Sequence, residues 1–458
     1  MKEKKKILIF IDLPIILRHF IANKTFSYLE ENYNLIYVFN QEKYDFKKNH
    51  IVNKFIDSSK IRVINMPNKR TGTWFWLYII TVIRQQKSSK GYQSRLKVIS
   101  LSIGKRNLFL ARIAALPGIY HIFKLLFINF LGIHKGIKEL IKIENPSLII
   151  HPTVLSGSYI NDLLRIFEFY QKKLPLIFLM NSWDNPSGKA FCTGSPSKLV
   201  VWGEQTKRHA IKFMRLKEKD IECYGAAQFE VYKKECKYSR KELSQLFNVN
   251  QNKKIIVYAG AGNGSYETRY LKLLDNYVNS KFLGDCQILY RPHPWRGALG
   301  VGEKDFLSQK WDNIVMDPSM YDYYKNEINN PKGLPSLVDY DFSHKLLNLA
   351  DAVISPLSTI LIEAILNGKP ILLFFPEGTD DNYKPANMNH FEELIQLNEV
   401  NVCSQEEDFL QSCLDLYSQI GNKTLSKKLI KDSQYFINPS KESYGENLYK
   451  LVKSYIEK

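Results

Sequence analysis

Short apolar runs alternate with amphipathic stretches along most of the chain. In the first half, stretches with helical spacing, such as 20–33 and 160–170, lie between the apolar runs. Apolar runs without regular polar interruption are typical of strands buried in a parallel sheet. This alternation predicts βαβ units, in which helices cover both faces of the sheet. The predicted strands of the first half are 6–11, 35–39, 61–66, 148–151, 176–180, 199–202 and 221–224.

The second half repeats this rhythm, with predicted strands at 255–259, 287–290, 352–354 and 371–375. Residues 312–339, which contain several tyrosines and prolines, are expected to form a long surface loop. The prediction is an α/β protein with two facing Rossmann-like domains, in which ligands bind beyond the carboxyl ends of the strands. Its predicted parts are an N-terminal domain at 1–231, a linker at 232–254, a C-terminal domain at 255–430 and a helical tail at 431–458.

The net charge of +18 is concentrated in the first third of the 458-residue chain. Residues 1–140 hold 25 Lys and Arg against 8 Asp and Glu. Such an excess suits nucleic acid, an anionic membrane surface or an anionic substrate. The chain has no RNA-recognition motif and no interleaving of basic and aromatic residues, so nucleic acid is not an expected partner.

Residues 107–137 are apolar and aromatic, with cations between the apolar groups. No span reaches the roughly 18–20 uncharged residues that a transmembrane helix needs. Two alternatives remain: a surface for a membrane interface, or a core helix with a solvated basic side. The six cysteines form no Cys-x-x-Cys pair, and Asp12 interrupts the first apolar run. We therefore expect free thiols, no metal site, no signal peptide and a cytoplasmic location.

The richest candidate site begins where the predicted strand 352–354 ends. Ser355 follows this strand, and a helix is expected over 360–367. Ser358 and Thr359 are good N-cap residues for that helix. Backbone amides and hydroxyls that gather at a helix start form a site for anions.

Positive charge and a carboxylate are expected near this anion site. Arg291 and His293 follow the predicted strand 287–290, and the prolines and arginines around His293 favour an anion-binding histidine over a core histidine. Glu363 lies four residues after Thr359, about one helical turn further on. It either accepts the hydroxyls of a ribose or is a solvated helix residue.

A glycine-rich loop follows the predicted strand 255–259. Gly260, Gly262 and Gly264 either let backbone amides approach a phosphate or form a plain tight turn. The spacing is not Gly-x-Gly-x-x-Gly, and no acidic residue ends the next strand, so NAD is not an expected cofactor. The chain also lacks a P-loop, Gly-x-Ser-x-Gly and His-Glu-x-x-His, the best-marked signatures of nucleotide hydrolases, serine hydrolases and zinc proteases.

Polar residues also follow two predicted strands of the first domain. Trp183, Asp184 and Asn185 lie on a Pro- and Gly-containing loop after strand 176–180. This set suits the stacking and hydrogen bonding of a polyol, or it forms a structural Asx-turn.

Asp12, Arg18 and His19 follow the first predicted strand. A carboxylate or an imidazole at this place could take a proton from an acceptor hydroxyl. The alternative is that these residues cap the helix that follows.

Together these motifs resemble glycosyltransferases of the two-Rossmann-domain (GT-B) type, over about residues 145–375. Within that type they are most similar to bacterial enzymes that build capsule, lipopolysaccharide or teichoic polymers. Arg-Pro-His-Pro at 291–294 and Ser355-Pro-Leu-Ser-Thr359, together with Glu363, resemble the His-Pro and Ser/Thr motifs of sialyltransferases, capsular Kdo transferases and glycerophosphate polymerases. The resemblance implies that His293, Ser358 and Thr359 hold the phosphate of the donor nucleotide. The acidic motif of sialyltransferases is absent, which argues against transfer of sialic acid.

The sequence thus predicts a metal-independent glycosyltransferase that needs no cofactor and uses a nucleotide-sugar as its donor substrate. A surface glycan or a lipid-linked molecule is the expected acceptor, and the basic N-terminal third would hold the enzyme at the inner face of the cell membrane. Two alternatives are a transferase of CDP-linked polyol phosphates and a non-catalytic basic protein that binds nucleic acid or membrane. The predicted residues are catalytic Asp12, Asp184 and His293; donor-binding Arg291, His293, Ser355, Ser358, Thr359, Glu363, Gly262 and Gly264; and acceptor-binding Arg18, His19, Trp183 and Asn185.

Overall fold

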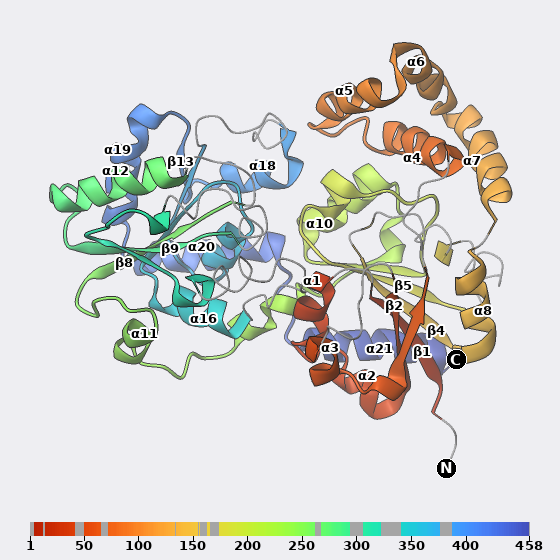
Figure 1. Ribbon diagram of the computed structural model, residues 1–458, viewed down its shortest axis with the longest axis horizontal. Coiled ribbons are helices and arrows are strands. Elements are labelled where there is room, and N and C mark those ends of the chain that lie inside the picture. Colours follow the sequence, from red (N-terminus) through yellow and green to blue (C-terminus); the bar gives the residue numbers. More distant parts are fainter. Residues whose placement is uncertain are drawn as a thin grey trace. The chain divides into compact units, whose positions relative to one another are not determined.

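The chain forms two compact units (Figure 1). Unit 1 comprises Met1–Gln228, Ala386–His390 and Ile437–Lys458, and unit 2 comprises Phe229–Pro385 and Phe391–Phe436. The segment predicted as a linker, 232–254, therefore lies within unit 2, and the last helix of the predicted tail lies within unit 1. The computed structural model describes residues 4–11, 14–41, 50–65, 72–132, 134–153, 155, 163–164, 174–261, 267–293, 306–321, 340–375 and 387–457.

Unit 1 is built on a seven-stranded parallel sheet with the strand order β3-β2-β1-β4-β5-β6-β7. Helices α2 (Ser27–Asn32) and α21 (Tyr444–Ile456) pack against each other beside this sheet. Apart from Lys6 at the start of β1, its central strands are buried along their whole length, which is why they read as apolar runs rather than as alternating patterns. All seven were predicted: β1 (Lys6–Ile11), β2 (Asn34–Asn40), β3 (Ile61–Ile64), β4 (Leu148–Thr153), β5 (Leu176–Met180), β6 (Lys198–Val201) and β7 (Ile221–Cys223).

Unit 2 contains a six-stranded parallel sheet with the order β10-β9-β8-β11-β12-β13. The two edge strands, β10 and β13, were not predicted, and the prediction of a loop over 312–339 is wrong at β10. Each has only three residues and therefore gives a weak pattern, although β7, which is as short, was predicted. The strands are β8 (Lys254–Ala259), β9 (Cys286–Arg291), β10 (Ile314–Met316), β11 (Ala352–Ser355), β12 (Ile371–Phe374) and β13 (Asn401–Cys403).

Aromatic rings fill the core of unit 2 between sheet and helices. Tyr270 on α12 (Glu267–Asn279) lies 4.7 Å from Phe374 on β12 and 5.2 Å from Phe409 on α19 (Phe409–Ser418), measured between ring centroids. All three side chains are almost completely buried. Each such ring buries a large apolar area, and tilted ring pairs add a favourable electrostatic term. This cluster fixes α12 and α19 against the sheet.

In both units the first strand lies in the interior of the sheet. β8 has β9 on one side and β11 on the other, and β1 lies between β2 and β4. In unit 2 the chain runs from β8 to β9 on one side and from β11 to β12 on the other, so the connections after the neighbouring strands β8 and β11 run in opposite directions. The same holds for β1 and β4 in unit 1. In open parallel sheets, ligands bind at the carboxyl ends of the strands beside such a switch point.

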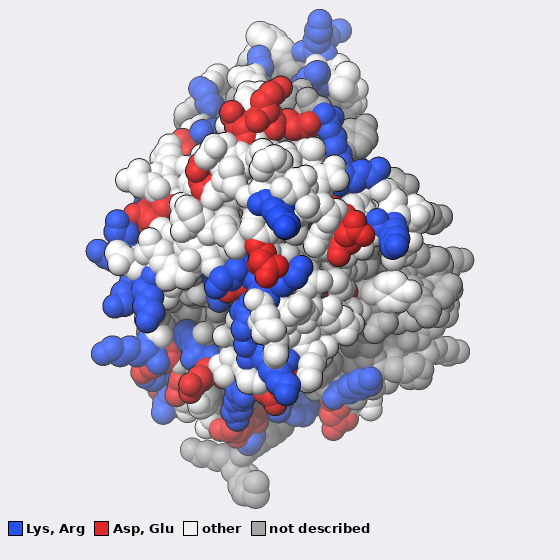
Figure 2. All heavy atoms as spheres, turned by 90° about the vertical axis from the view of Figure 1, so that its left-hand side faces the viewer, with Lys and Arg blue, Asp and Glu red and all other residues white. Residues whose placement is uncertain are grey.

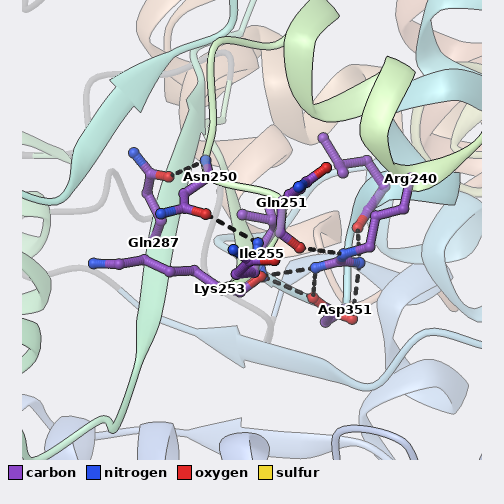
Figure 3. Close-up of polar contacts among 9 residues, drawn as sticks. Arg240, Asn250, Gln251, Lys253, Ile255, Gln287 and Asp351 are labelled. Atoms are coloured by element: carbon purple, nitrogen blue, oxygen red, sulfur yellow. Dashed lines mark hydrogen bonds and ion pairs between the residues drawn. The ribbon is translucent and has the colours of Figure 1, made fainter.

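A polar network at the amino ends of β8 and β11 binds the start of unit 2 to its sheet (Figure 3). Arg240, the first residue of α11 (Arg240–Leu246), donates to Asp351 over 2.8 Å and to the carbonyls of Gln251 and Lys253. The amide of Ile255 donates to the same Asp351 carboxylate over 2.7 Å. The carboxylate of Asp351, the residue directly before β11, thus joins α11 and β8 to that strand.

Unit 1 carries a group of helices away from its sheet, drawn in orange in Figure 1. They are α4 (Gly72–Gln85), α5 (Tyr92–Ile103), α6 (Lys105–Ala114) and α7 (Pro117–Leu131), followed by α8 (Lys135–Glu144). The first four share one apolar cluster, which includes Phe191 from a distant loop. Among the described helices no single one is long and apolar enough to cross a membrane; α6 and α7 meet that criterion only as a pair, bent by 100°.

We expect Asp351→Ala to destabilise unit 2, because Arg240 and the amide of Ile255 lose a shared acceptor. Loss of such an acceptor costs about 1–3 kcal/mol, or roughly 3–10 °C in melting temperature for a unit of this size. Differential scanning calorimetry measures the shift. Asp285→Ala is the matched control, since Asp285 is 77% exposed and lies 3.6 Å from Lys253; an exposed pair contributes at most about 1 kcal/mol. Equal shifts in the two variants would contradict the assignment.

Candidate functional site

Three adjacent strands of unit 2 end side by side at the switch point. Arg291 at the end of β9 pairs with Ala259 at the end of β8, and Ser355 ends β11 on the other side of β8. The Ser355 hydroxyl donates to the Ala259 carbonyl over 2.8 Å, and the Gly260 amide donates to the Arg291 carbonyl over 2.9 Å. The structure therefore brings residues 291–293 and 355–359 to one edge of one sheet.

Arg291 is buried with only 8% of its surface exposed. Its Nη2 donates to the Ser343 hydroxyl over 2.8 Å, and its Nε lies 3.9 Å from Oδ2 of Asp317. Burial raises the pKa of Asp317, whereas the Arg291 guanidinium and the hydrogen bonds from Ser319 oppose that rise. Nη1 of Arg291 has no hydrogen-bond partner among the residues that the structure describes. Two residues later, His293 is half-buried.

Helix α17 (Ile360–Leu366) begins directly after the two predicted hydroxyl residues. Thr359 is its N-cap, and both Ser358 and Thr359 are half-buried. Gly368, two residues after the end of the helix, is left-handed with φ +64°, where a side chain would be strained. Ser355, in contrast, is completely buried and its hydroxyl is engaged by the strand next to it.

Glu363 lies on α17 and is largely buried. The hydroxyl of Tyr232 donates to Oε2 of Glu363. Burial and the adjacent carboxylate raise the pKa of Tyr232 well above its ordinary value, so the phenol remains a donor. The ring of His344 packs edge-on against Tyr232, with 5.7 Å between centroids. Glu363 is therefore a held carboxylate rather than a solvated helix residue.

Gly260 is required by close packing. A Cβ atom at this position would lie 2.4 Å from Oε2 of Glu267. The Glu267 carboxylate is buried and accepts from the amide of Ala261 and from the hydroxyl of Tyr290. Gly262 and Gly264, the other two glycines of the predicted loop, lie outside the described residues, as does Asp12 in unit 1.

In unit 1, His19 is the best-defined of the predicted residues. It lies on a short π-helical segment, Leu17–Ile21, and its Nδ1 is 2.8 Å from Oδ1 of Asn181, the residue after β5. An amide oxygen only accepts, so Nδ1 carries the proton in this pair. Burial and the nearby Arg18 lower the pKa of His19 to about 3, which keeps the imidazole neutral. Arg18 itself is half-buried.

The loop after β5 is closed on itself. Oδ1 of Asn185 accepts from the amide of Ser182 over 2.8 Å, and its Nδ2 donates to Asp184 over 3.1 Å. Trp183 is buried, and its ring lies edge-on to His390 at 5.0 Å. Of the predicted residues in this loop, only Asp184 is half-exposed. The hydrogen bonds of Asn185 fit the structural turn that was the alternative interpretation.

Sequence reasoning missed the side chains that hold the predicted ones. Asp317 and Ser343 fix Arg291, and Tyr232 fixes Glu363, although Tyr232 lies in the predicted linker and Asp317 in the predicted loop. The short run Ile314–Met316 directly before Asp317 is the one signal that could have indicated a strand end at that place.

Comparison with known proteins gives a clear result for the fold. No family model matches the chain, and no curated protein matches it. A protein assigned as a UDP-N-acetylglucosamine 2-epimerase from Listeria monocytogenes is 13% identical, with 99% of this chain and 97% of that chain covered and a TM-score of 0.54. MnaA of S. aureus, solved with UDP, is 11% identical, with 99% and 97% covered and a TM-score of 0.53. A variant of the wall teichoic acid polymerase TagF is 11% identical, with 99% and 90% covered and a TM-score of 0.50.

The chain has the GT-B fold. The prediction of two Rossmann-like α/β domains is therefore confirmed, and so is the helical C-terminal end. Sequence identities of 11–13% support the fold assignment but no assignment of activity or substrate. The roles predicted for single residues stay predictions.

We expect the imidazole of His19 to remain neutral from pH 8 to pH 5, because its pKa of about 3 lies below this range. The ring ¹⁵N shifts of histidine-labelled protein report both the charge and the protonated nitrogen, and loss of one signal in His19→Gln assigns it. Asn181→Asp should raise the pKa, since a carboxylate would stabilise the imidazolium. A His19 signal that titrates near the ordinary value of about 6.5 would contradict the assignment.

Proposed function

We propose that this protein is a glycosyltransferase that moves a sugar from a nucleotide-activated donor to a bacterial surface glycan or a lipid-linked acceptor. The observation that carries the proposal is the convergence of a buried arginine, a half-buried histidine, two hydroxyls and a buried carboxylate at the switch point of a GT-B sheet. These groups are Arg291, His293, Ser358, Thr359 and Glu363.

We infer that the donor phosphate binds at the start of α17. The first amides of a helix have no acceptor within the helix, and the helix dipole favours an anion there. Hydroxyls of Ser358 and Thr359 would add donors, and Arg291 and His293 would supply positive charge. Asp317 offsets part of the Arg291 charge and, with Ser343, fixes the direction of the guanidinium.

Glu363 is proposed to accept hydrogen bonds from the ribose of the donor. A carboxylate has about four acceptor sites, and the bond from Tyr232 occupies one of them. That bond restricts the rotamers of Glu363 before any ligand arrives, which lowers the entropy cost of binding.

Transfer breaks the bond between the anomeric carbon and the phosphate oxygen and forms a bond to an acceptor oxygen. Negative charge then develops on the leaving phosphate, and fixed donors at α17 would stabilise it. The acceptor hydroxyl must lose a proton. Asp12 and Asp184 remain the proposed bases, because the low pKa of His19, about 3, makes its imidazole a weak proton acceptor.

The proposal predicts that nucleotide binding depends on His293 and Ser358. A panel of UDP-, GDP- and CMP-sugars and CDP-glycerol should contain a ligand that raises the melting temperature, because a ligand that binds only the folded protein stabilises it. His293→Ala and Ser358→Ala should each weaken that binding about ten- to hundredfold, the typical loss of a hydrogen bond to a charged group. Isothermal titration calorimetry measures the change.

Two variants serve as controls for these substitutions. His121→Ala on α7 and Ser418→Ala on α19 replace the same residue types at exposed positions and should leave the affinity unchanged. Unchanged affinity in His293→Ala and Ser358→Ala would refute the site. Transfer of glycerol phosphate from CDP-glycerol would establish the polyol-phosphate alternative. Conversion of UDP-N-acetylglucosamine to its epimer without an acceptor would show that the protein is an epimerase and not a transferase.

Metal independence is a separate prediction. The charge of the donor phosphate is proposed to be met by Arg291, His293 and backbone amides, so excess EDTA should leave the rate of transfer unchanged. The assay is release of the nucleotide in the presence of acceptor. A rate that falls with EDTA and recovers with Mg²⁺ or Mn²⁺ would contradict the prediction.

A further inference from the structure

Helices α5 to α7 of unit 1 expose an unusual amount of apolar surface. Eleven of the 22 large apolar side chains exposed in the described part of the chain lie between residues 98 and 130. The most exposed are Leu101 at 81%, Phe130 at 80%, Phe109 at 63% and Ile122 at 61%. Scattered single residues of this kind are normal on a protein surface, but a concentration marks an interaction surface.

The same helices carry charge of one sign. Residues 72–132 contain nine Lys and Arg and no Asp or Glu. Elsewhere the two signs are mixed, as Figure 2 shows for the side of the molecule that carries α12 and α19 in Figure 1. Lys105, Arg106 and Arg112 on α6 are exposed beside the apolar residues. An apolar surface edged by cations complements an anionic lipid surface.

A cavity opens among α4, α6 and α7. Its volume is about 380 Å³, and all of its lining residues are apolar, among them Trp76, Ile80, Leu110, Phe123 and Phe127. Apart from the indole N–H of Trp76, these side chains offer a ligand no hydrogen-bonding group, so the cavity suits a hydrocarbon chain.

The lengths of the helices define how they meet a bilayer. α7 has 15 residues, so it is about 22 Å long, whereas the hydrocarbon core of a bilayer is about 30 Å thick. The 100° bend between α6 and α7 also prevents a straight span. Helices of this kind lie in the interface, with the apolar side towards the acyl chains.

We infer that the exposed face of α5 to α7 binds an anionic lipid bilayer and that a lipid hydrocarbon chain occupies the cavity. A second copy of the chain is the other apolar occupant to consider. A symmetric contact would place the six Lys and Arg of α5 to α7 against six of the same sign, without any acid from these helices, and like-charge repulsion opposes this. The inference does not rest on the proposed transferase activity.

Hydrogen bonds attach this helical group to the loop after β5. Nε2 of Gln85 donates to the Cys192 carbonyl over 2.6 Å, and Arg95 donates to the Gly188 carbonyl. The ring of Phe191 packs edge-on against Trp74 and Tyr78, at 5.7 and 5.1 Å between centroids. The lipid-binding helices are therefore held to the segment that carries the proposed acceptor residues Trp183 to Asn185.

Flotation of the full chain with vesicles tests the inference. The wild type should bind vesicles that contain phosphatidylcholine and phosphatidylglycerol, and should bind phosphatidylcholine alone about tenfold less or weaker. Phe109→Ser/Leu126→Ser/Phe130→Ser should reduce partitioning roughly hundredfold, because three exposed apolar groups no longer enter the bilayer. Lys105→Glu/Arg106→Glu should remove the preference for anionic vesicles.

Matched substitutions elsewhere are the controls. Ile143→Ser/Phe282→Ser changes equally exposed apolar residues, and Lys423→Glu/Lys427→Glu changes exposed cations on α20; both should bind like the wild type. Absence of vesicle binding by the wild type, equal binding by the triple serine variant, or equal binding to neutral vesicles would overturn the inference. So would a lipid-free dimer that the triple variant converts to a monomer without any change in vesicle binding. Because no nucleotide enters this assay, its outcome is independent of the donor-binding test.

Discussion

The parallel register of β9, β8 and β11 is the constraint on which the candidate site of unit 2 depends. It places Arg291, Ala259 and Ser355 in one row, so the loops that follow start from neighbouring points. Both ends of this register are fixed by side chains, at the carboxyl end by the hydroxyl of Ser355 and at the amino end by the carboxylate of Asp351. A slip by one residue would turn every buried side chain of a strand to the other face, so the register is strongly specified.

Polar groups in the interior make the site rigid but also costly. Arg291 is almost completely buried, and a charge in such a place is tolerated only when other groups compensate it. Asp317 supplies the opposite charge, and Ser343 a hydrogen bond. Tyr232 likewise donates a hydrogen bond to the buried carboxylate of Glu363. The candidate site therefore consists of two layers, in which residues remote in sequence orient the ones proposed to meet a ligand.

From the sequence we named the residues proposed to meet a ligand but missed the side chains that orient them, and the reasons are physical. Long buried strands such as β1, β4 and β5 give clear apolar runs, whereas the three-residue edge strands β10 and β13 give only weak patterns and were missed. β7 is equally short but was predicted. Asp317 follows β10, so its place beside Arg291 was hidden as well. Trp183 lies on a Pro- and Gly-containing loop, and this composition suggested a side chain that is accessible to a ligand. The side chain is nevertheless buried. Partners that meet through tertiary packing, such as Tyr232 and Glu363, leave no local pattern.

The path of the chain sets an order for folding. Unit 1 is completed by Ile437–Lys458, and Asn438 donates to the carbonyls of Trp202 and Cys223 while α21 packs on α2 and β4. All of unit 2 precedes that segment in the sequence and is therefore synthesised before it. The usual order, in which the N-terminal domain folds first during synthesis, is thus altered. Unit 2 can finish its core as an insertion, whereas the face of unit 1 that α21 covers stays open until α21 has been made.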